Sequence, residues 1–132
     1  FAVNLTSNII FLKLFEPYLK KTNQSQVLIS TTEIINQKKP FWGLYSASKA
    51  ALEQIAYSYA EETQNTNIKV NLIDPGIVNT KLRLKAYPGE DKQKITQPSD
   101  LSDFFEDILF NDKFANGELI RYADWLESSK RV

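Results

Sequence analysis

Tyr45 and Lys49 are the two side chains of this sequence whose types and spacing most directly suggest chemistry. They lie four residues apart in the stretch YSASK, and an apolar periodic run follows. We therefore expect both on one face of a helix, with their Cβ atoms about 5–6 Å apart. A neighbouring cation favours the ionised form of a phenol and lowers its pKa from about 10, so the pair predicts a proton donor and acceptor that works near neutral pH. The same spacing also fits an exposed tyrosine and lysine without a role in chemistry, and the surrounding elements decide between the two.

Two short apolar runs, residues 26–30 and 68–73, have the near-continuous, β-branched composition of strands that are buried on both faces. Helices are expected before and after the first of them. Apolar positions at helical spacing cover residues 1–21, where Pro17 predicts a kink or a stop one residue earlier. A long, alanine-rich helix is expected over residues 44–63.

The rest of the chain continues this alternation of helix and strand. Residues 77–97 are polar and irregular, a helix is expected over residues 98–110, and residues 118–122 are expected as a last short strand. Residues 123–132 carry no clear pattern. Strands that alternate with helices of this length predict an α/β fold, with right-handed crossovers and a parallel sheet of three strands.

Both of the first two expected strands end in residues that suit a binding site. Residues 30–32 are Ser-Thr-Thr, and residues 74–76 are Asp-Pro-Gly. Ligands of open parallel sheets bind beyond the carboxyl ends of the strands. Tyr45 follows the first of these ends closely, and this convergence favours the functional interpretation of the pair.

Composition excludes several other classes of chemistry. Lysine plus arginine and aspartate plus glutamate both number 16, so no strong field favours nucleic acid or an anionic membrane surface. The sequence has no cysteine and no histidine. This rules out disulfides, thiol nucleophiles, Ser-His-Asp hydrolysis and the usual zinc ligands, and we expect no metal site. No apolar run approaches the roughly 18–20 residues of a membrane span, and a cytoplasmic protein is expected.

The stretch YSASKAAL at 45–52, followed by VNLIDPG at 70–76, resembles the short-chain dehydrogenase/reductase family. The resemblance covers essentially the whole chain. It implies the C-terminal half of a doubly wound, parallel-sheet, Rossmann-type fold, so residues 1–132 are expected as a partial Rossmann-type catalytic domain. Three short stretches, TT at 31–32, WG at 42–43 and YPGED at 87–91, are most similar to a bacterial subgroup, the YciK-type oxidoreductases.

The resemblance implies roles for four side chains. Tyr45 would be the general acid that protonates a carbonyl oxygen, and the base in the reverse direction. Lys49 would lower the pKa of Tyr45 and bind the nicotinamide ribose. Thr32 stands thirteen positions before Tyr45, where the family usually has a serine that holds the substrate carbonyl, and Ser30 is a weaker candidate for that role. Asn4 resembles the asparagine that supports a water-linked proton relay to the lysine, although a lone helical asparagine often has no such role.

The turn after the second strand resembles the one that holds the nicotinamide end of the cofactor. Pro75 and Gly76 would form this turn, the backbone of Val78 would meet the carboxamide, and Thr80 would bind the carboxamide or a phosphate. An ordinary strand-to-loop turn has the same Pro-Gly signature. Asp74 stands where many members have asparagine, and no role follows from that difference.

The sequence predicts a fragment that lacks the other half of the cofactor site. It begins at Phe1, inside an expected helix, and contains no methionine. A dinucleotide site needs a Gly-rich turn at a helix N-terminus. The four glycines do not have that spacing: they are Gly43, Gly76, Gly89 and Gly117. We therefore expect NAD or NADP as the cofactor of the whole protein, and not to be bound by this fragment alone.

The function expected from the resemblance is hydride transfer between NAD(P) and a small carbonyl or alcohol substrate. A 3-oxoacyl thioester reductase, or an epimerase or dehydratase with the same Tyr/Lys pair, is the alternative among enzymes. A non-catalytic relative that acts as a binding module is the alternative outside them. Residues 77–97 would be a mobile substrate lid, or a plain surface loop. The two expected N-terminal helices have broad apolar faces, and the resemblance implies that family members pair through them, so a homodimer or homotetramer is expected. The sheet and the missing half could instead cover these faces.

Overall fold

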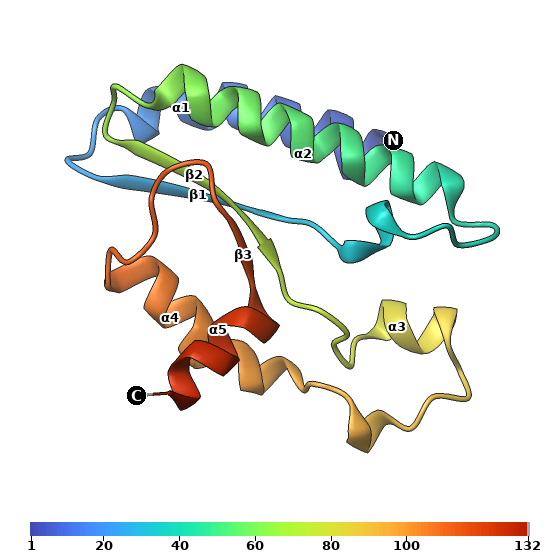
Figure 1. The fold of residues 1–132 in the computed structure, drawn as a ribbon. Helices are drawn as coiled ribbons and strands as arrows, with labels where there is room; N and C mark the ends of the chain where they lie inside the picture. Colours follow the sequence, from blue (N-terminus) through green and yellow to red (C-terminus); the bar gives the residue numbers. More distant parts are fainter. Residues whose placement is uncertain (132) are drawn as a thin grey trace. The chain divides into compact units, whose positions relative to one another are not determined.

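The computed structural model describes residues 1–131, which fold into two compact units (Figure 1). The first unit holds residues 1–74 and 115–120, and the second holds residues 75–114 and the chain from residue 121 onward. Each unit is described below by itself. Among the described residues, no helix is both long enough and apolar enough to cross a membrane.

A three-stranded sheet is the centre of the first unit. Its strands are β1 (Ser25–Ser30), β2 (Ile68–Asp74) and β3 (Leu119–Arg121), in the order β1-β2-β3. β1 and β2 are parallel, with Ser25 opposite Ile68 and Ser30 opposite Ile73. The predicted α/β fold with three parallel strands between helices is confirmed, and each strand lies within one residue of its expected bounds.

Two long helices cover one face of this sheet (Figure 1). α1 (Ser7–Leu19) follows a π-helical turn, η1 (Ala2–Thr6), and α2 (Gly43–Thr63) follows a short 3₁₀ turn, η2 (Glu33–Asn36). Helices and strands therefore alternate as the apolar patterns predict.

Pro17 does not end α1. The helix continues to Leu19, and the Lys20 N–H still donates to the Glu16 carbonyl at 3.0 Å. A proline in the last turn removes only its own N–H from the ladder, so the residues after it can stay helical. The stop expected near residue 16 is wrong. The irregular turn lies at the other end of the helix, where the Thr6 N–H reaches back five residues to the Phe1 carbonyl at 3.0 Å.

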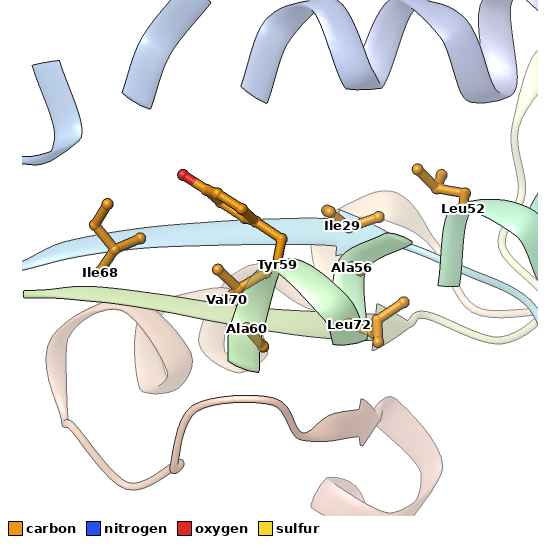
Figure 2. Close-up of a cluster of buried hydrophobic side chains, with 8 residues drawn as sticks. All are labelled: Ile29, Leu52, Ala56, Tyr59, Ala60, Ile68, Val70 and Leu72. Carbon is orange, nitrogen blue, oxygen red and sulfur yellow. The ribbon is translucent and has the colours of Figure 1, made fainter. Parts of the chain in front are cut away.

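The core of the first unit lies between α2 and the sheet. Figure 2 shows side chains of the helix and of both strands meeting in one apolar cluster. Its members are Ile29, Leu52, Ala56, Tyr59, Ala60, Ile68, Val70 and Leu72. Ala56 and Ala60 are 1% and 2% exposed, and their small side chains allow the helix backbone to approach β2 closely. This packing fixes α2, and with it Tyr45 and Lys49, against the sheet.

The second unit is mostly helical. It contains α3 (Lys81–Ala86), η3 (Lys92–Lys94), η4 (Pro98–Leu101), α4 (Ser102–Phe110) and α5 (Tyr122–Lys130). The helix expected over residues 98–110 begins as a 3₁₀ turn and continues as α4. The C-terminal tail, which has no clear pattern in the sequence, forms α5.

Residues 77–97 contain more regular structure than the sequence predicts. Thr80 caps α3 by accepting a hydrogen bond from the Arg83 N–H at 3.1 Å. The Arg83 guanidinium donates two bonds of 2.7 Å to the Glu90 carboxylate and lies 3.9 Å from the centre of the Tyr87 ring. The prediction of a purely irregular loop is wrong, because the Thr80 cap and the contacts of Arg83 with Tyr87 and Glu90 hold the segment together.

Candidate active site

The first turn of α2 carries Tyr45 beside an aromatic neighbour. Gly43 begins the helix, and Phe41 just before it has a φ of 68°, an unusual backbone conformation for a residue with a side chain. The Trp42 and Tyr45 rings meet edge to face, with 5.5 Å between their centres. The sharp turn thus delivers the Tyr45 phenol, half-buried, to the start of the helix.

Lys49 connects the helix to the end of the first strand. Its ammonium donates a hydrogen bond of 3.0 Å to the carbonyl of Ser30, the last residue of β1. Burial lowers the pKa of the Lys49 ammonium below its ordinary value of 10.5. The cation expected from the sequence therefore lies at the carboxyl end of a parallel strand, where ligands of such sheets bind.

Burial raises the pKa of the Tyr45 phenol above its ordinary value of 10.0. This is opposite to the direction expected from Lys49 alone, and burial of the phenol is its cause. Tyr45 consequently carries its proton at neutral pH. A neutral phenol of this kind can donate a proton.

Thr32 lies just past β1 with its hydroxyl at the start of η2. The Oγ1 atom accepts from the Ile34 N–H at 3.4 Å, so its own proton remains available for another acceptor. The Ser46 hydroxyl donates to the Ile34 carbonyl at 3.4 Å and links this turn to α2. Ser30 instead contributes its main-chain carbonyl, as the acceptor for Lys49.

Asn4 is bonded to the same part of α2. Its side-chain amide donates to the Ser48 hydroxyl at 3.2 Å, and that hydroxyl donates to the Tyr45 carbonyl at 2.8 Å. The Asn4 carbonyl accepts from the Asn8 side chain at 3.0 Å. Asn4 lies within the π-helical turn η1, a distortion that is frequent at functional sites. The structure thus joins Asn4 to the turn of α2 that holds Tyr45 and Lys49.

The residues expected to hold the nicotinamide end follow β2 and belong to the second unit. Gly76 has a φ of 73°, and a side chain there would meet no atom within 4 Å. Val78 pairs with Thr96 as a short parallel bridge, and Thr80 caps α3. The structure therefore brings together Tyr45, Lys49, Asn4 and the Thr32 turn within the first unit, and the turn from Pro75 to Thr80 within the second.

Sequence reasoning missed two polar residues in the first unit. Ser48, only 1% exposed, connects Asn4 to α2. Thr31, 5% exposed, donates its hydroxyl to the carboxylate of Glu53. The position of Glu53, four residues after Lys49, was the only signal, and it indicates a shared helix face without naming a partner. Over residues 1–131, no group of three acidic side chains is arranged to hold a metal ion.

Comparison with known proteins gives one family match. The family model described as short chain dehydrogenase matches residues 1–91. The uncharacterized oxidoreductase YciK of Escherichia coli K12 is 30% identical over 110 residues, which are 83% of this chain and 43% of that protein. NADPH-dependent aldehyde reductase 2, a chloroplastic protein of Arabidopsis thaliana, is 31% identical over 77 residues, or 58% of this chain and 28% of that protein.

Solved structures agree with these sequence matches. The crystal structure of YciK from E. coli superposes with a TM-score of 0.83 at 28% identity, over 90% of this chain and 49% of that one. A short chain dehydrogenase from E. coli CFT073, crystallised with NADPH, gives the same TM-score and identity, over 90% of this chain and 50% of that one. The predicted resemblance to YciK-type oxidoreductases is confirmed. The chain spans about half the length of these relatives.

Proposed function

This chain belongs to the short chain dehydrogenase family, and from that premise we propose that the protein carrying it is an oxidoreductase acting on a carbonyl/alcohol pair with NAD or NADP. One observation carries the proposal furthest. The Lys49 ammonium lies at the carboxyl end of β1, bonded to the Ser30 carbonyl, one helical turn from a Tyr45 phenol that holds its proton at neutral pH. A proton donor and a cation at this edge suit the reduction of a carbonyl.

In the proposed reaction, Tyr45 donates its proton to the substrate oxygen in reduction and takes it back in oxidation. The Thr32 hydroxyl donates a hydrogen bond to the same oxygen and orients it. The Lys49 cation offsets part of the cost of ionising Tyr45, so that the phenolate formed in each cycle is less unfavourable. Asn4 would support a water-linked proton relay to Lys49, and its bond to Ser48 also holds the first turn of α2 in place.

Each unit, taken by itself, carries groups that suit the nicotinamide end of the proposed cofactor. Lys49 is half-buried with donors to spare for a ribose hydroxyl, and the open surroundings of Gly76 allow a ligand to approach the backbone closely. Pro75 shapes that turn, while the Val78 backbone and the Thr80 hydroxyl would meet the carboxamide. When bound, the cofactor supplies or accepts the hydride.

We also propose that residues 1–132 are the catalytic half of a Rossmann-type domain whose Gly-rich, pyrophosphate-binding half lies outside them. The four glycines of this chain do not form that turn. Two structural relatives were crystallised with NADPH and with NADP, and both are about twice as long as this chain. These relatives support NADP as the first cofactor to assay, with NAD as its comparison. The cytoplasmic location stays a prediction, which cell fractionation would test.

The test is Tyr45→Phe in the intact protein, assayed by nicotinamide absorbance with a panel of ketones, aldehydes, 3-oxoacyl thioesters and alcohols. Loss of the proton donor should lower kcat by roughly 10²–10⁴-fold. Tyr59→Phe is the matched control. It removes a buried hydroxyl from the same helix, and that hydroxyl has no hydrogen-bond partner within the described residues. Equal turnover in the Tyr45→Phe variant and the wild type would contradict the proposed role.

A further inference from the structure

A buried hydrogen bond joins the end of β1 to α2 beside the proposed catalytic groups. Thr31 is 5% exposed, and its hydroxyl donates to the Glu53 carboxylate. Glu53 lies one helical turn beyond Lys49 and two turns beyond Tyr45, so the three side chains share a face of α2. The bond therefore ties the strand end to the helix face that carries the proposed chemistry.

The backbone around Thr31 is fixed on one side by the sheet. The Thr31 N–H donates to the Ile73 carbonyl of β2 at 2.8 Å, which continues the ladder past the last residue of β1. On the other side, the Ser30 carbonyl accepts from Lys49 at 3.0 Å. The hydrogen bond from Thr31 to Glu53 involves neither Tyr45 nor Lys49, whereas the bond to the Ser30 carbonyl comes from Lys49 itself. The Thr31–Glu53 bond can hold the strand end in place while Tyr45 and Lys49 react.

The Lys49 ammonium is a second possible partner for the Glu53 carboxylate. A glutamate four residues after a lysine on a helix can pair with its ammonium. In this structure the carboxylate accepts from Thr31, and the Lys49 ammonium donates to the Ser30 carbonyl. A hydrogen bond to a charged acceptor is stronger than one to a neutral acceptor. The buried Thr31 hydroxyl can therefore compete with the Lys49 ammonium for the Glu53 carboxylate.

We infer that Thr31 and Glu53 are a positioning pair. Their hydrogen bond sets the Ser30 carbonyl and the Thr32 hydroxyl opposite Lys49. It also prevents the Glu53 carboxylate from forming an ion pair with the Lys49 ammonium. Neither residue touches a reacting atom. The expected effect on enzyme kinetics rests on the proposed function. The expected change in the position of Lys49 rests on the geometry alone.

Thr31→Val in the intact protein is the direct test, because valine keeps the branched shape and removes only the hydroxyl. We expect a loss of about tenfold to a hundredfold in kcat/KM, divided between kcat and the KM for the nicotinamide cofactor, as for a small misplacement of reacting groups. In the crystal structure of the variant, the Lys49 ammonium should move from Ser30 to Glu53. The pKa of Lys49, followed by NMR of its side chain, should rise as a carboxylate replaces a carbonyl.

Four further variants sharpen the result. Thr31→Ser keeps the donor and should restore kcat/KM to within about twofold of the wild type. Thr63→Val removes another buried hydroxyl from α2, bonded to the Tyr59 carbonyl at 2.8 Å, and should leave the kinetics unchanged. Glu53→Gln cannot form the ion pair, so combining it with Thr31→Val should return Lys49 to the Ser30 carbonyl. If Thr31→Val does not fold, Glu53→Gln alone should show a smaller loss in kcat/KM with the pKa of Lys49 unchanged.

Failure of the inference is distinct from failure of the proposed function. A Thr31→Val structure with the Lys49–Ser30 bond intact and an unchanged pKa of Lys49 would overturn the positioning pair, whatever the activity. A wild-type protein without hydride transfer, in which Thr31→Val still moves Lys49 onto Glu53, would overturn the proposed function and leave the positioning pair standing.

Discussion

Tyr45 is the residue at which two effects on a single proton oppose each other. Burial raises the pKa of the phenol. As a general rule, a cation one helical turn away favours the phenolate. Burial prevails in this structure, so the phenol is neutral at physiological pH. In the proposed mechanism this phenol donates its proton, and Lys49 would make the resulting phenolate less unfavourable.

A titration of the phenol tests this balance. We expect Tyr45 to ionise above its ordinary pKa of 10.0, because burial disfavours the phenolate. The proposed reductase activity should therefore fall only as the pH rises past 10, when the donor is lost. Lys49→Met should move the titration further upward, by roughly one unit, because it removes a positive charge and keeps the length of the side chain.

The measurement is the ultraviolet absorbance of phenolate in the wild type, with Tyr45→Phe as the reference that identifies the signal. Lys69→Met, on β2, is the control for a general change in net charge. A Tyr45 midpoint below 10 in the protein without cofactor would contradict the dominance of burial.

Among the elements, α4 and α5 are joined by one carboxylate and a cluster of aromatic rings. Asp107 accepts from Lys113 at 2.8 Å, from the Trp125 indole at 2.8 Å and from Asn111 at 2.6 Å. These bonds, the one from Lys113 first, lower the pKa of Asp107 from 3.8 to about 2. Phe104 is 0% exposed and its ring packs edge-on against Trp125. The short tail helix is thus held by a charged centre as well as by apolar contact.

The second unit should accordingly lose stability in acid. A carboxyl group whose pKa is lower in the folded state stabilises that state above its unfolded pKa of about 3.8, and the effect disappears as the pH falls towards 2. Asp107→Asn should remove this pH dependence and cost about 1–3 kcal/mol near neutral pH, because a charged acceptor of three donors is lost.

Hydrogen exchange of α4 and α5 between pH 5 and pH 2, corrected for the intrinsic rate, measures this effect. Asp103→Asn changes an exposed carboxyl group on the same helix and should behave like the wild type. Equal protection of α5 in the wild type and in Asp107→Asn at pH 5 would contradict the role of this carboxylate.

At the scale of the whole molecule, α1 presents an apolar stripe to solvent. Five of its side chains, each at least half exposed, repeat at helical spacing: Ile10 50%, Phe11 55%, Leu14 60%, Phe15 54% and Tyr18 66%. Exposed apolar areas of this kind mark interaction surfaces. We propose that two copies of the protein pair through this stripe, as a homodimer or as part of a homotetramer.

Phe11→Glu combined with Leu14→Glu should turn the assembly into a monomer, because it places charges in the middle of the proposed interface. Sedimentation of the intact protein at several concentrations measures the change. Phe110→Glu, on an exposed apolar side chain of α4 that is 79% exposed, should leave the assembly unchanged. A wild-type protein that sediments as a monomer would contradict the proposal.

The sequence predicts those features of the structure that are determined by residues close together in the chain. The runs at 26–30 and 68–73 are almost entirely apolar, so burial alone predicts β1 and β2. The position of Tyr45 and Lys49 at a strand end follows from the order of the elements. The partner of Glu53 has no local cause, because Thr31 lies 22 residues away in the sequence. Within residues 77–97, the contacts of Arg83 join residues four and seven apart, and they depend on the path of the folded loop.

The pKa of Tyr45 shows the same limit at a single atom. Spacing reveals that Lys49 is near, but it does not reveal how much solvent each group has lost. The π-helical turn at Asn4 is comparable, since its residues have ordinary helical character and the extra residue in the turn appears only once the helix is packed. The site residues stay a prediction, and their hydrogen-bond partners and pKa shifts depend on three-dimensional packing.

The acceptor that holds Lys49 is a main-chain carbonyl, and this has a consequence for how the protein can change by mutation. Every amino acid carries that carbonyl, so a substitution at position 30 that preserves the strand also preserves the contact. The side chain of Ser30 is exposed, so other side chains can take its place without loss of this contact. The position of the Lys49 ammonium thus depends on the backbone of β1. Side chains around the proposed site can change by mutation while this positive charge stays in place.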